Sequence, residues 1–121
     1  MRDILKILVV EDDPLVRMLV QKQLARLGMQ VEAVATGEEA VTYDKTRLGL
    51  VFMDIGLPGI DGVRATLLIR EAETKENGRR IPIVAFTAHS DKQRCLSAGM
   101  DDFLQKPALL ADLKRMLDKW L

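Results

Sequence analysis

Residues 4–14 read ILKILVVEDDP, an apolar run that changes abruptly into a run of acids. The segment up to Val10 is apolar apart from Lys6 and is rich in β-branched residues. This pattern is typical of a strand that is buried on both faces of a parallel sheet. Three acids follow at residues 11–13, and Pro14 then stands where the first turn of a helix tolerates proline. The segment therefore predicts a buried strand that ends at a polar edge and leads into a helix.

Apolar spacing along the rest of the chain predicts a regular alternation of strands and helices. We expect further strands at residues 30–35, 50–53, 81–86 and 102–105, and helices at 14–27, 37–45, 62–74, 91–98 and 109–121. Right-handed crossover connections place such helices on both faces of a parallel sheet. The predicted fold class is therefore α/β, a doubly wound, five-stranded parallel sheet.

Two strand orders are plausible for a sheet of this kind. The dinucleotide-binding order would carry a glycine-rich turn after the first strand, where a helix N-terminus holds pyrophosphate. Here that turn consists of acids, which would repel a pyrophosphate. We therefore predict the flavodoxin-like order 2-1-3-4-5.

Length and composition narrow the class of protein. The 121 residues are 48% apolar, and 18 basic residues balance 18 acidic ones, which is typical of one globular domain over residues 1–121. A net charge of zero without a polybasic segment argues against direct nucleic-acid binding. Cys95 is the single cysteine, and no signal segment or long apolar stretch is present. These features predict a cytoplasmic protein that makes no membrane contact of its own.

The residues that end the predicted strands carry the chemistry. Parallel strands all end at one edge of the sheet, so these side chains should lie close together. The predicted set consists of Glu11, Asp12, Asp54, Thr87 and Lys106. Three neighbouring carboxylates need a cation, and hard oxygen ligands favour Mg²⁺. A divalent ion, a lysine and a hydroxyl beside an aspartate are what the formation of an aspartyl phosphate requires.

Four motifs in this order resemble the receiver domains of two-component response regulators, and they span essentially the whole chain. They are ILVVED at residues 7–12, MDIGLPGIDG at 53–62, FTA at 86–88 and QKP at 105–107. The sequence is most similar to receivers of hybrid sensor histidine kinases. The resemblance implies a phosphoprotein that catalyses its own phosphorylation and dephosphorylation and turns over no metabolite. Its partner would be a histidine kinase or a histidine phosphotransfer domain.

The resemblance also implies a role for individual residues. Asp54 would accept the phosphoryl group, and Thr87 and Lys106 would contact its oxygens. The Lys106–Pro107 peptide bond would be cis. Thr87 and Phe103 would form a switch that reshapes the surface of the fourth helix, fifth strand and fifth helix. Here Phe103 stands where a tyrosine is more common.

For the metal, the resemblance implies that Glu11, Asp12, Asp54 and the backbone carbonyl of Gly56 hold Mg²⁺. Gly56 departs from the family, which more often has a larger side chain at that position. Side-chain control of dephosphorylation from this position is therefore missing. His89, two residues after Thr87, resembles a position that controls the access of water to the phosphoryl group.

Other interpretations stay open at this point. A phosphatase of the haloacid dehalogenase type also uses Mg²⁺ and an aspartate nucleophile, but it needs a second aspartate where Gly56 stands. A binding-only receiver would lack part of the set of acids, hydroxyl and lysine, which is complete here. Taken alone, acids after a strand suit any helix N-terminus, and Lys106 could be a surface charge. Only their joint placement at one edge favours the phosphorylation site.

The first predicted helix has more apolar residues than its core face requires. Its core positions recur at helical spacing, namely Val16, Val20, Leu24 and Leu27. Leu15 and Met18 remain on an adjoining stripe beside the acids. We expect this stripe to be the docking surface for the phosphohistidine partner. The sequence leaves open whether the chain acts alone or is the cytoplasmic part of a membrane-bound sensor kinase.

Overall fold

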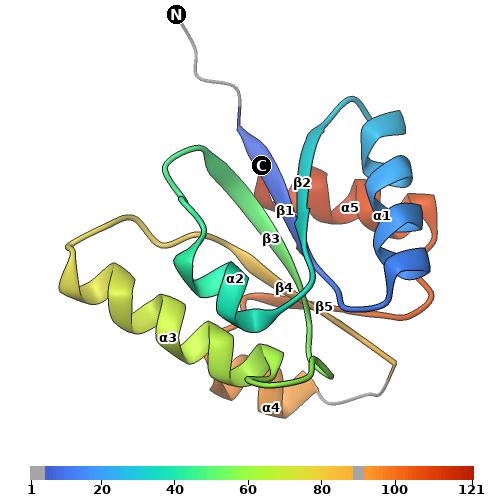
Figure 1. Ribbon diagram of the computed structural model, residues 1–121. Helices are drawn as coiled ribbons and strands as arrows, with labels where there is room; N and C mark the ends of the chain where they lie inside the picture. The colour runs from blue at the N-terminus through green and yellow to red at the C-terminus, as the bar shows by residue number, and fades with distance from the viewer. Residues whose placement is uncertain (1–4, 89–91) are drawn as a thin grey trace, which may run out of the picture.

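The computed structural model describes residues 5–88 and 92–121, and its strands and helices alternate along the chain (Figure 1). The strands are β1 (Lys6–Val10), β2 (Gln30–Val34), β3 (Leu48–Asp54), β4 (Ile83–Thr87) and β5 (Asp102–Gln105). The helices are α1 (Pro14–Arg26), α2 (Gly37–Thr42), α3 (Gly62–Lys75), α4 (Lys92–Ser97) and α5 (Leu110–Trp120). This alternation confirms the α/β class.

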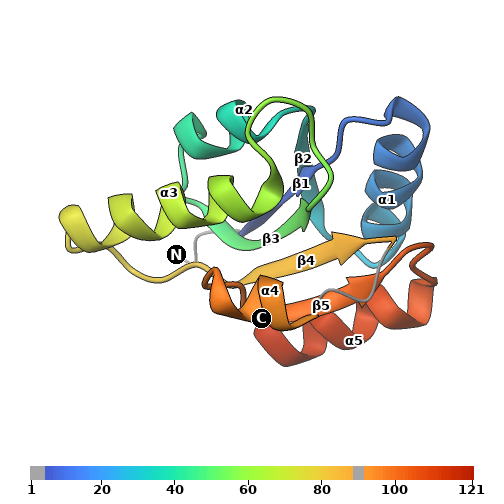
Figure 2. The same cartoon turned by 90° about the horizontal axis from the view of Figure 1, so that it is seen from below.

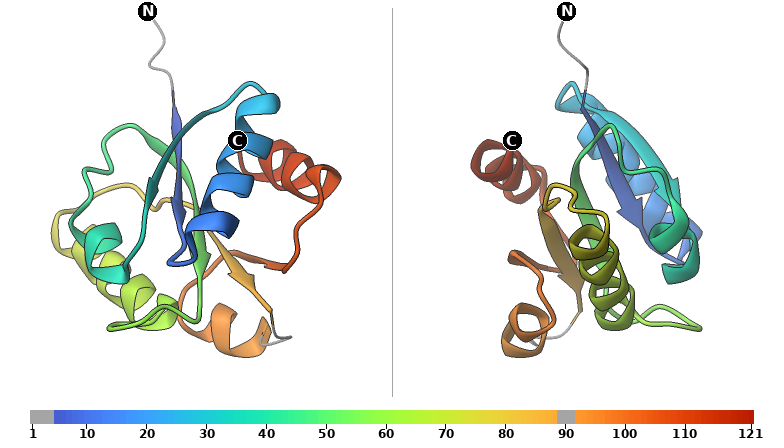
Figure 3. Two further views of the ribbon diagram at one scale, coloured as in Figure 1. Left: turned by 45° about the vertical axis from the view of Figure 1, so that its right-hand side comes forward. Right: turned by 90° about the vertical axis from the view of Figure 1, so that its left-hand side faces the viewer.

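All neighbouring strands pair in parallel, in the order β2-β1-β3-β4-β5. The predicted flavodoxin-like order is therefore confirmed. Helices α1 and α5 cover one face of the sheet, and α2, α3 and α4 cover the other (Figure 3). The sequence of β1 is apolar at successive positions because both faces of this strand are buried. Ile7 and Val9 pack under α1 and α5, while Leu8 and Val10 pack on the opposite side.

Carboxylate caps begin the two helices that flank the acidic edge. Asp13 Oδ1 accepts hydrogen bonds from the backbone amides of Leu15 (2.9 Å) and Val16 (3.3 Å) at the start of α1. Asp61 Oδ1 accepts one from the amide of Arg64 (2.8 Å) at the start of α3. These bonds satisfy amides that have no partner within the helix.

Several predicted boundaries differ from the structure, among them the strand expected at 50–53, which spans Leu48–Asp54. Two of the differences have an identifiable reason. The predicted helix over residues 37–45 ends at Thr42. Lys45 Nζ donates to the carbonyls of Val41 (2.7 Å) and Tyr43 (2.9 Å), and so satisfies backbone groups left at the helix end. The predicted strand over 81–86 begins at Ile83 instead. Its predecessor Pro82 has no amide hydrogen to donate to the ladder.

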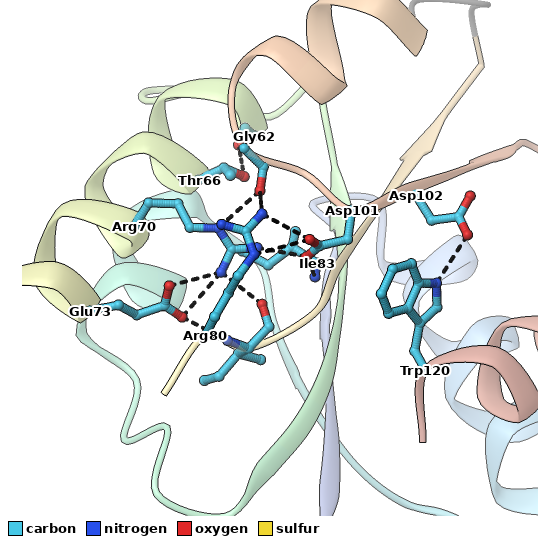
Figure 4. A network of polar contacts seen from close by, with 11 residues as sticks. Gly62, Thr66, Arg70, Glu73, Arg80, Ile83, Asp101, Asp102 and Trp120 are labelled. Carbon is cyan, nitrogen blue, oxygen red and sulfur yellow. Dashed lines mark hydrogen bonds and ion pairs between the residues drawn. The ribbon is translucent and has the colours of Figure 1, made fainter. Parts of the chain in front are cut away.

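A partly buried polar network joins α3 to the segment between α4 and β5 (Figure 4). Arg70 donates to Glu73 (2.8 Å), to the carbonyl of Gly99 (2.9 Å) and to Asp101 (2.7 Å). Asp101 in turn accepts from Arg80 (2.8 Å) and from the amide of Ile83. The network fixes the N-terminal ends of β4 and β5. The predicted site residues lie at the opposite edge of the sheet, where the strands end.

Candidate functional site

The strands β1, β3, β4 and β5 all run towards one edge of the sheet (Figure 2). A cleft of about 590 Å³ lies at the residues that follow these strand ends. Its lining includes all five strand-end residues that the sequence predicts, Glu11, Asp12, Asp54, Thr87 and Lys106. This volume lies in the range of small-molecule sites, about 300–1000 Å³. The parallel topology thus assembles residues that are up to 95 positions apart, from 11 to 106.

Three carboxylates form the acidic side of the cleft. One oxygen from each of Glu11, Asp12 and Asp54 lies within 4.8 Å of the others. Glu11 is only 3% exposed and Asp54 only 6%, whereas Asp12 is exposed at the rim. Backbone amides help to hold the buried pair: Asp13 donates to Glu11 (3.1 Å) and Gly56 donates to Asp54 (3.2 Å).

Lys106 supplies the positive charge inside the cleft. Its Nζ pairs with Glu11 Oε1 and lies 3.3 Å from Asp54 Oδ2. Burial alone would lower the pKa of Lys106, but its interactions with Glu11 and Asp54 outweigh this effect and raise that pKa. Burial raises the pKa of Glu11, and the ammonium of Lys106 opposes this only in part. Lys106 therefore keeps its positive charge, and its ammonium interacts with two buried acids.

The donor set fits a divalent ion. Three carboxylates against one ammonium leave a formal charge of −2, and all the donors are hard oxygens. Glu11 Oε1 is buried, and its contact with Lys106 lacks hydrogen-bond geometry. A bound cation would give this buried oxygen an additional electrostatic partner. The residues present therefore suit Mg²⁺, as the sequence predicts.

The remaining predicted residues lie on β4, β5 and the turn that follows. Thr87 is buried at the end of β4, and its carbonyl accepts a hydrogen bond from the amide of Lys106 (2.7 Å). The Lys106–Pro107 peptide bond is cis. Phe103 is partly buried and packs against the core beneath α3 and α4. His89 lies outside the described residues.

Two arginines beside the cleft carry contacts that the sequence analysis missed. Arg17 on α1 donates from Nη1 to the carbonyls of Glu11 (2.9 Å) and Asp12 (3.4 Å), which ties the acidic turn to the helix. Arg94 on α4 reaches across the rim to Asp61, with 3.2 Å between Nη2 and Oδ2. For Arg17, the sequence offered one signal, its position about one helical turn after the acids. For Arg94, no nearby residue in the sequence indicated a contact with Asp61.

The face of α1 beside the cleft is apolar and open. Leu15 is 60% exposed, Met18 42% and Leu19 50%. Of these three residues, Leu19 lines a groove of about 250 Å³, and Val16 and Lys106 line both this groove and the acidic cleft. Leu15 and Met18 are thus exposed on α1, and their role as a docking surface stays a prediction.

A second hollow, of about 630 Å³, lies between α2, α3 and the loop before β4. It contains none of the predicted site residues. Its cations already have partners, because Lys45 donates to Val41 and Tyr43, and Arg79 donates to the carbonyls of Lys45 (3.0 Å) and Thr46 (3.3 Å). We interpret this hollow as structural.

Comparison with known proteins identifies relatives along nearly the whole chain. The family described as "Response regulator receiver domain" matches residues 7–118. The sensor histidine kinase GacS of Pseudomonas protegens is 39% identical over 119 residues, which are 95% of this chain and 13% of that protein. The chain therefore spans only a small part of such relatives. Among the helices of residues 5–88 and 92–121, none has the length and apolar character needed to cross a membrane.

Solved structures show the same fold. The receiver domain of a sensor histidine kinase from Pseudomonas aeruginosa, with a magnesium ion in its active-site cleft, is 41% identical, with a TM-score of 0.83 and coverage of 97% of both chains. The receiver domain of Ssk1 from Saccharomyces cerevisiae, in complex with the histidine phosphotransfer protein Ypd1, is 28% identical. Its TM-score is 0.90, with coverage of 99% of this chain and 90% of that one.

Proposed function

The chain belongs to the response regulator receiver domain family, and we propose that it accepts a phosphoryl group from a phosphohistidine onto Asp54. The observation that carries this proposal is the position of Asp54. Its carboxylate is buried at the floor of an open cleft, between two further acids and the ammonium of Lys106.

In the transfer, a carboxylate oxygen of Asp54 attacks the phosphorus atom in line with the bond that breaks. The P–N bond of the phosphohistidine breaks, and the imidazole nitrogen leaves with the electron pair. Lys106 and the Thr87 hydroxyl would bind the phosphoryl oxygens, because both line the cleft around Asp54. The Lys106 ammonium would then neutralise charge that the acids alone would repel.

Glu11, Asp12, Asp54 and the carbonyl of Gly56 would hold Mg²⁺ in this scheme. When bound, the ion neutralises charge on the acids and on the phosphoryl oxygens. Arg17 would help by fixing the backbone from which Glu11 and Asp12 project. The alternative of a phosphatase with a second catalytic aspartate is disfavoured, since Gly56 occupies the required position and presents no side chain.

The partner that we propose is a histidine phosphotransfer helix bundle or the equivalent domain of a kinase. Leu15, Met18 and the adjoining groove offer an apolar surface beside the cleft, where a helix carrying phosphohistidine could pack. The Ssk1 receiver, which has the same fold, forms a complex with such a phosphotransfer protein. The similarity to GacS supports a place within a hybrid sensor kinase. The proposed compartment is the reducing cytoplasm, which suits a chain whose single cysteine, Cys95, is buried and forms no disulfide within the chain.

Phosphorylation would act through Thr87 and Phe103. A phosphoryl group would draw the Thr87 hydroxyl towards Asp54, and Phe103 would move into the space that becomes available. Thr87 pairs with Gln105 of β5 in the sheet, and Phe103 lies on β5 itself, so the surface formed by α4, β5 and α5 would change shape.

The direct test is labelling of the protein with a phosphorylated histidine phosphotransfer domain in the presence of Mg²⁺. We expect one acid-stable, base-labile phosphoryl group, which Asp54→Asn abolishes. Asp118→Asn is the matched control, because it makes the same chemical change on the exposed face of α5. Full labelling of Asp54→Asn would contradict the assignment.

A further inference from the structure

The ammonium of Lys106 has an aromatic neighbour in addition to its two acids. Its Nζ lies over the ring of Phe86, 5.4 Å from the ring centroid. This distance is within the roughly 6 Å over which a cation–π interaction acts. The side chain of Lys106 is 21% exposed and Phe86 is 4% exposed, so water is largely excluded from the contact.

A similar contact on α5 shows what this exclusion of water changes. Lys119 Nζ also lies 5.4 Å from the ring centroid of its neighbour Trp120. The side chain of Lys119 is 59% exposed, however, so water competes with the ring for that ammonium. Because a cation–π interaction strengthens when it is desolvated, the contact of Lys106 with Phe86 is the stronger of the two.

The register of the sheet places Phe86 beside the proposed phosphoacceptor. Phe86 pairs with Asp54 on β3 and with Leu104 on β5. Its ring packs in the core beneath α1 and α5. Parallel pairing therefore brings the ring and the carboxylate to the same end of neighbouring strands, within reach of one lysine.

The position of Lys106 gives its ammonium two spaces to occupy. Lys106 lines both the acidic cleft and the groove along α1. Ala108 also lines this groove and contributes only a methyl group, so it does not fill the space. A lysine has a flexible four-carbon stem. Its ammonium therefore stays in the cleft only as long as contacts there outweigh those available in the groove.

The acids that hold Lys106 change their charge during the proposed phosphoryl transfer. Glu11 and Asp54 would both serve as ligands of Mg²⁺, and Asp54 gives up its free carboxylate when the acyl phosphate forms. Both changes weaken the attraction between these acids and the ammonium. The Phe86 ring neither ionises nor reacts, so its interaction with the ammonium is the same before and after the transfer.

We propose that Phe86 is a positioning residue, whose ring keeps the Lys106 ammonium in the cleft while the charges of Glu11 and Asp54 are engaged elsewhere. The inference rests on the proposed function, since it takes Lys106 as a group that binds the phosphoryl oxygens. It extends that function by assigning a residue that acts through the lysine and does not itself line the cleft.

The first test is the NMR chemical shift of the Lys106 side-chain methylene protons, because the ring current above an aromatic face moves such protons to lower frequency. We expect this displacement in the parent, relative to the exposed Lys114. It should persist when Mg²⁺ and beryllofluoride, an analogue of the phosphoryl group, are added. Phe86→Leu should abolish it and Phe86→Tyr should retain it. Loss of the displacement on addition of beryllofluoride would overturn the inference, since the lysine would then have left the ring.

The second test compares the rate constants for labelling by phosphoramidate and by a phosphorylated histidine phosphotransfer domain at saturating Mg²⁺. We expect Phe86→Leu to slow both reactions about three- to tenfold, since Lys106 serves both donors. Trifluorinated phenylalanine at position 86 keeps the shape of the ring but weakens its negative face, so its rates should lie between these values. Phe86→Tyr should stay within about twofold of the parent.

Phe52→Leu is the matched control. Phe52 is buried in the same core layer as Phe86 but lines neither the cleft nor the groove. Its replacement should lower the unfolding free energy and leave both labelling rates within about twofold of the parent. The same slowing in Phe52→Leu, or trifluorinated protein that reacts as fast as the parent, would show that Phe86 only packs the core and would overturn the inference. Failure of the parent to be labelled by either donor, with the displaced Lys106 protons present, would instead contradict the proposed function.

Discussion

Lys106 Nζ lies 3.3 Å from Asp54 Oδ2 while it also pairs with Glu11. One ammonium thus links the ends of β1 and β3 from the turn after β5. The arrangement keeps two buried carboxylates compatible with each other before a metal ion or a phosphoryl group arrives. The stability of the fold therefore depends in part on Lys106, Glu11 and Asp54, which are also the residues of the proposed site.

Replacing this lysine should expose that dependence. In Lys106→Ala the carboxylates of Glu11 and Asp54 lose their shared cation, and we expect the metal-free protein to lose about 1–3 kcal/mol of unfolding free energy. Urea unfolding followed by circular dichroism measures the change. Lys114→Ala, which removes an exposed lysine paired with Asp118, should cost less than about 1 kcal/mol. Equal effects of the two substitutions would show that the buried pair does not stabilise the fold.

Asp12 should behave in the opposite way, because it adds negative charge at the rim. We expect Asp12→Ala to weaken Mg²⁺ binding at least about tenfold, the effect of one lost charged ligand. Without Mg²⁺ its unfolding free energy should hold or rise, since repulsion from Glu11 and Asp54 is relieved. Calorimetric titration with Mg²⁺ gives the affinity. The same affinity in variant and parent would exclude Asp12 as a ligand.

Stability should depend on pH through Asp102. Burial opposes ionisation of this carboxylate, but Lys119, the Trp120 indole and the amide of Phe103 outweigh burial and lower the pKa of Asp102. Figure 4 shows the hydrogen bond from the Trp120 indole to Asp102. A carboxyl group whose pKa is lower in the folded state stabilises the fold above its unfolded pKa of about 4, and this contribution disappears as the pH falls through the folded pKa.

We therefore expect Asp102→Asn to be less stable than the parent at pH 7, with a difference that shrinks below about pH 4. Fluorescence of Trp120, the one tryptophan in the sequence, can follow urea unfolding across this range. Asp118→Asn on the exposed face of α5 serves as the control. A difference that stays constant from neutral to acid pH would show that the ion pair does not contribute.

The apolar face of α1 should matter only when the donor is a protein. Leu15→Asp should slow transfer from a phosphorylated histidine phosphotransfer domain about tenfold or more, because it places a charge in the proposed interface. Labelling by phosphoramidate should be nearly unchanged. Leu67→Asp makes the same change at a leucine of α3 that is 43% exposed and far from the groove. Loss in both assays, or in neither, would remove α1 from the docking surface.

Thr87 should couple phosphorylation to the surface of α4, β5 and α5. Thr87→Ala should still accept a phosphoryl group, but its response should be weak, because the methyl group cannot donate a hydrogen bond to the phosphoryl oxygens. Amide chemical shifts of Phe103 and α4, recorded before and after phosphorylation, measure that response. Thr87→Ser, which retains the hydroxyl, should respond as the parent does. Shifts in Thr87→Ala as large as those of the parent would contradict the coupling.

The sequence predicts the elements of this fold well where the pattern is local. The β5 strand matches its expected range of 102–105, and the helix that follows Asp61 differs from expectation by one residue at its end. The less accurate boundaries depend on neighbours. The end of α2 depends on where the side chain of Lys45 finds carbonyl partners. The carbonyl partners of Lys45 depend on the tertiary packing around it, which a short stretch of sequence does not reveal.

The strand order and the set of candidate residues follow from the sequence pattern alone. Apolar strands that end in acids, a hydroxyl and a lysine can only bring those groups to one edge once all strands are parallel. The spacing of these residues along the chain is enough for this prediction. The alternation of side chains along a strand and the right-handed crossover between parallel strands hold for nearly all proteins.

The pairing of the charged side chains, in contrast, depends on how the elements pack in three dimensions. Lys106 bridges Glu11 and Asp54, Arg17 holds the acidic turn, and Arg94 meets Asp61 across 33 residues of chain. Long side chains have several rotamers of similar energy, so their partners depend on which elements pack beside them and how deeply each group is buried. These contacts have no local signature, and they determine both the charge balance of the cleft and the accessibility of its mouth.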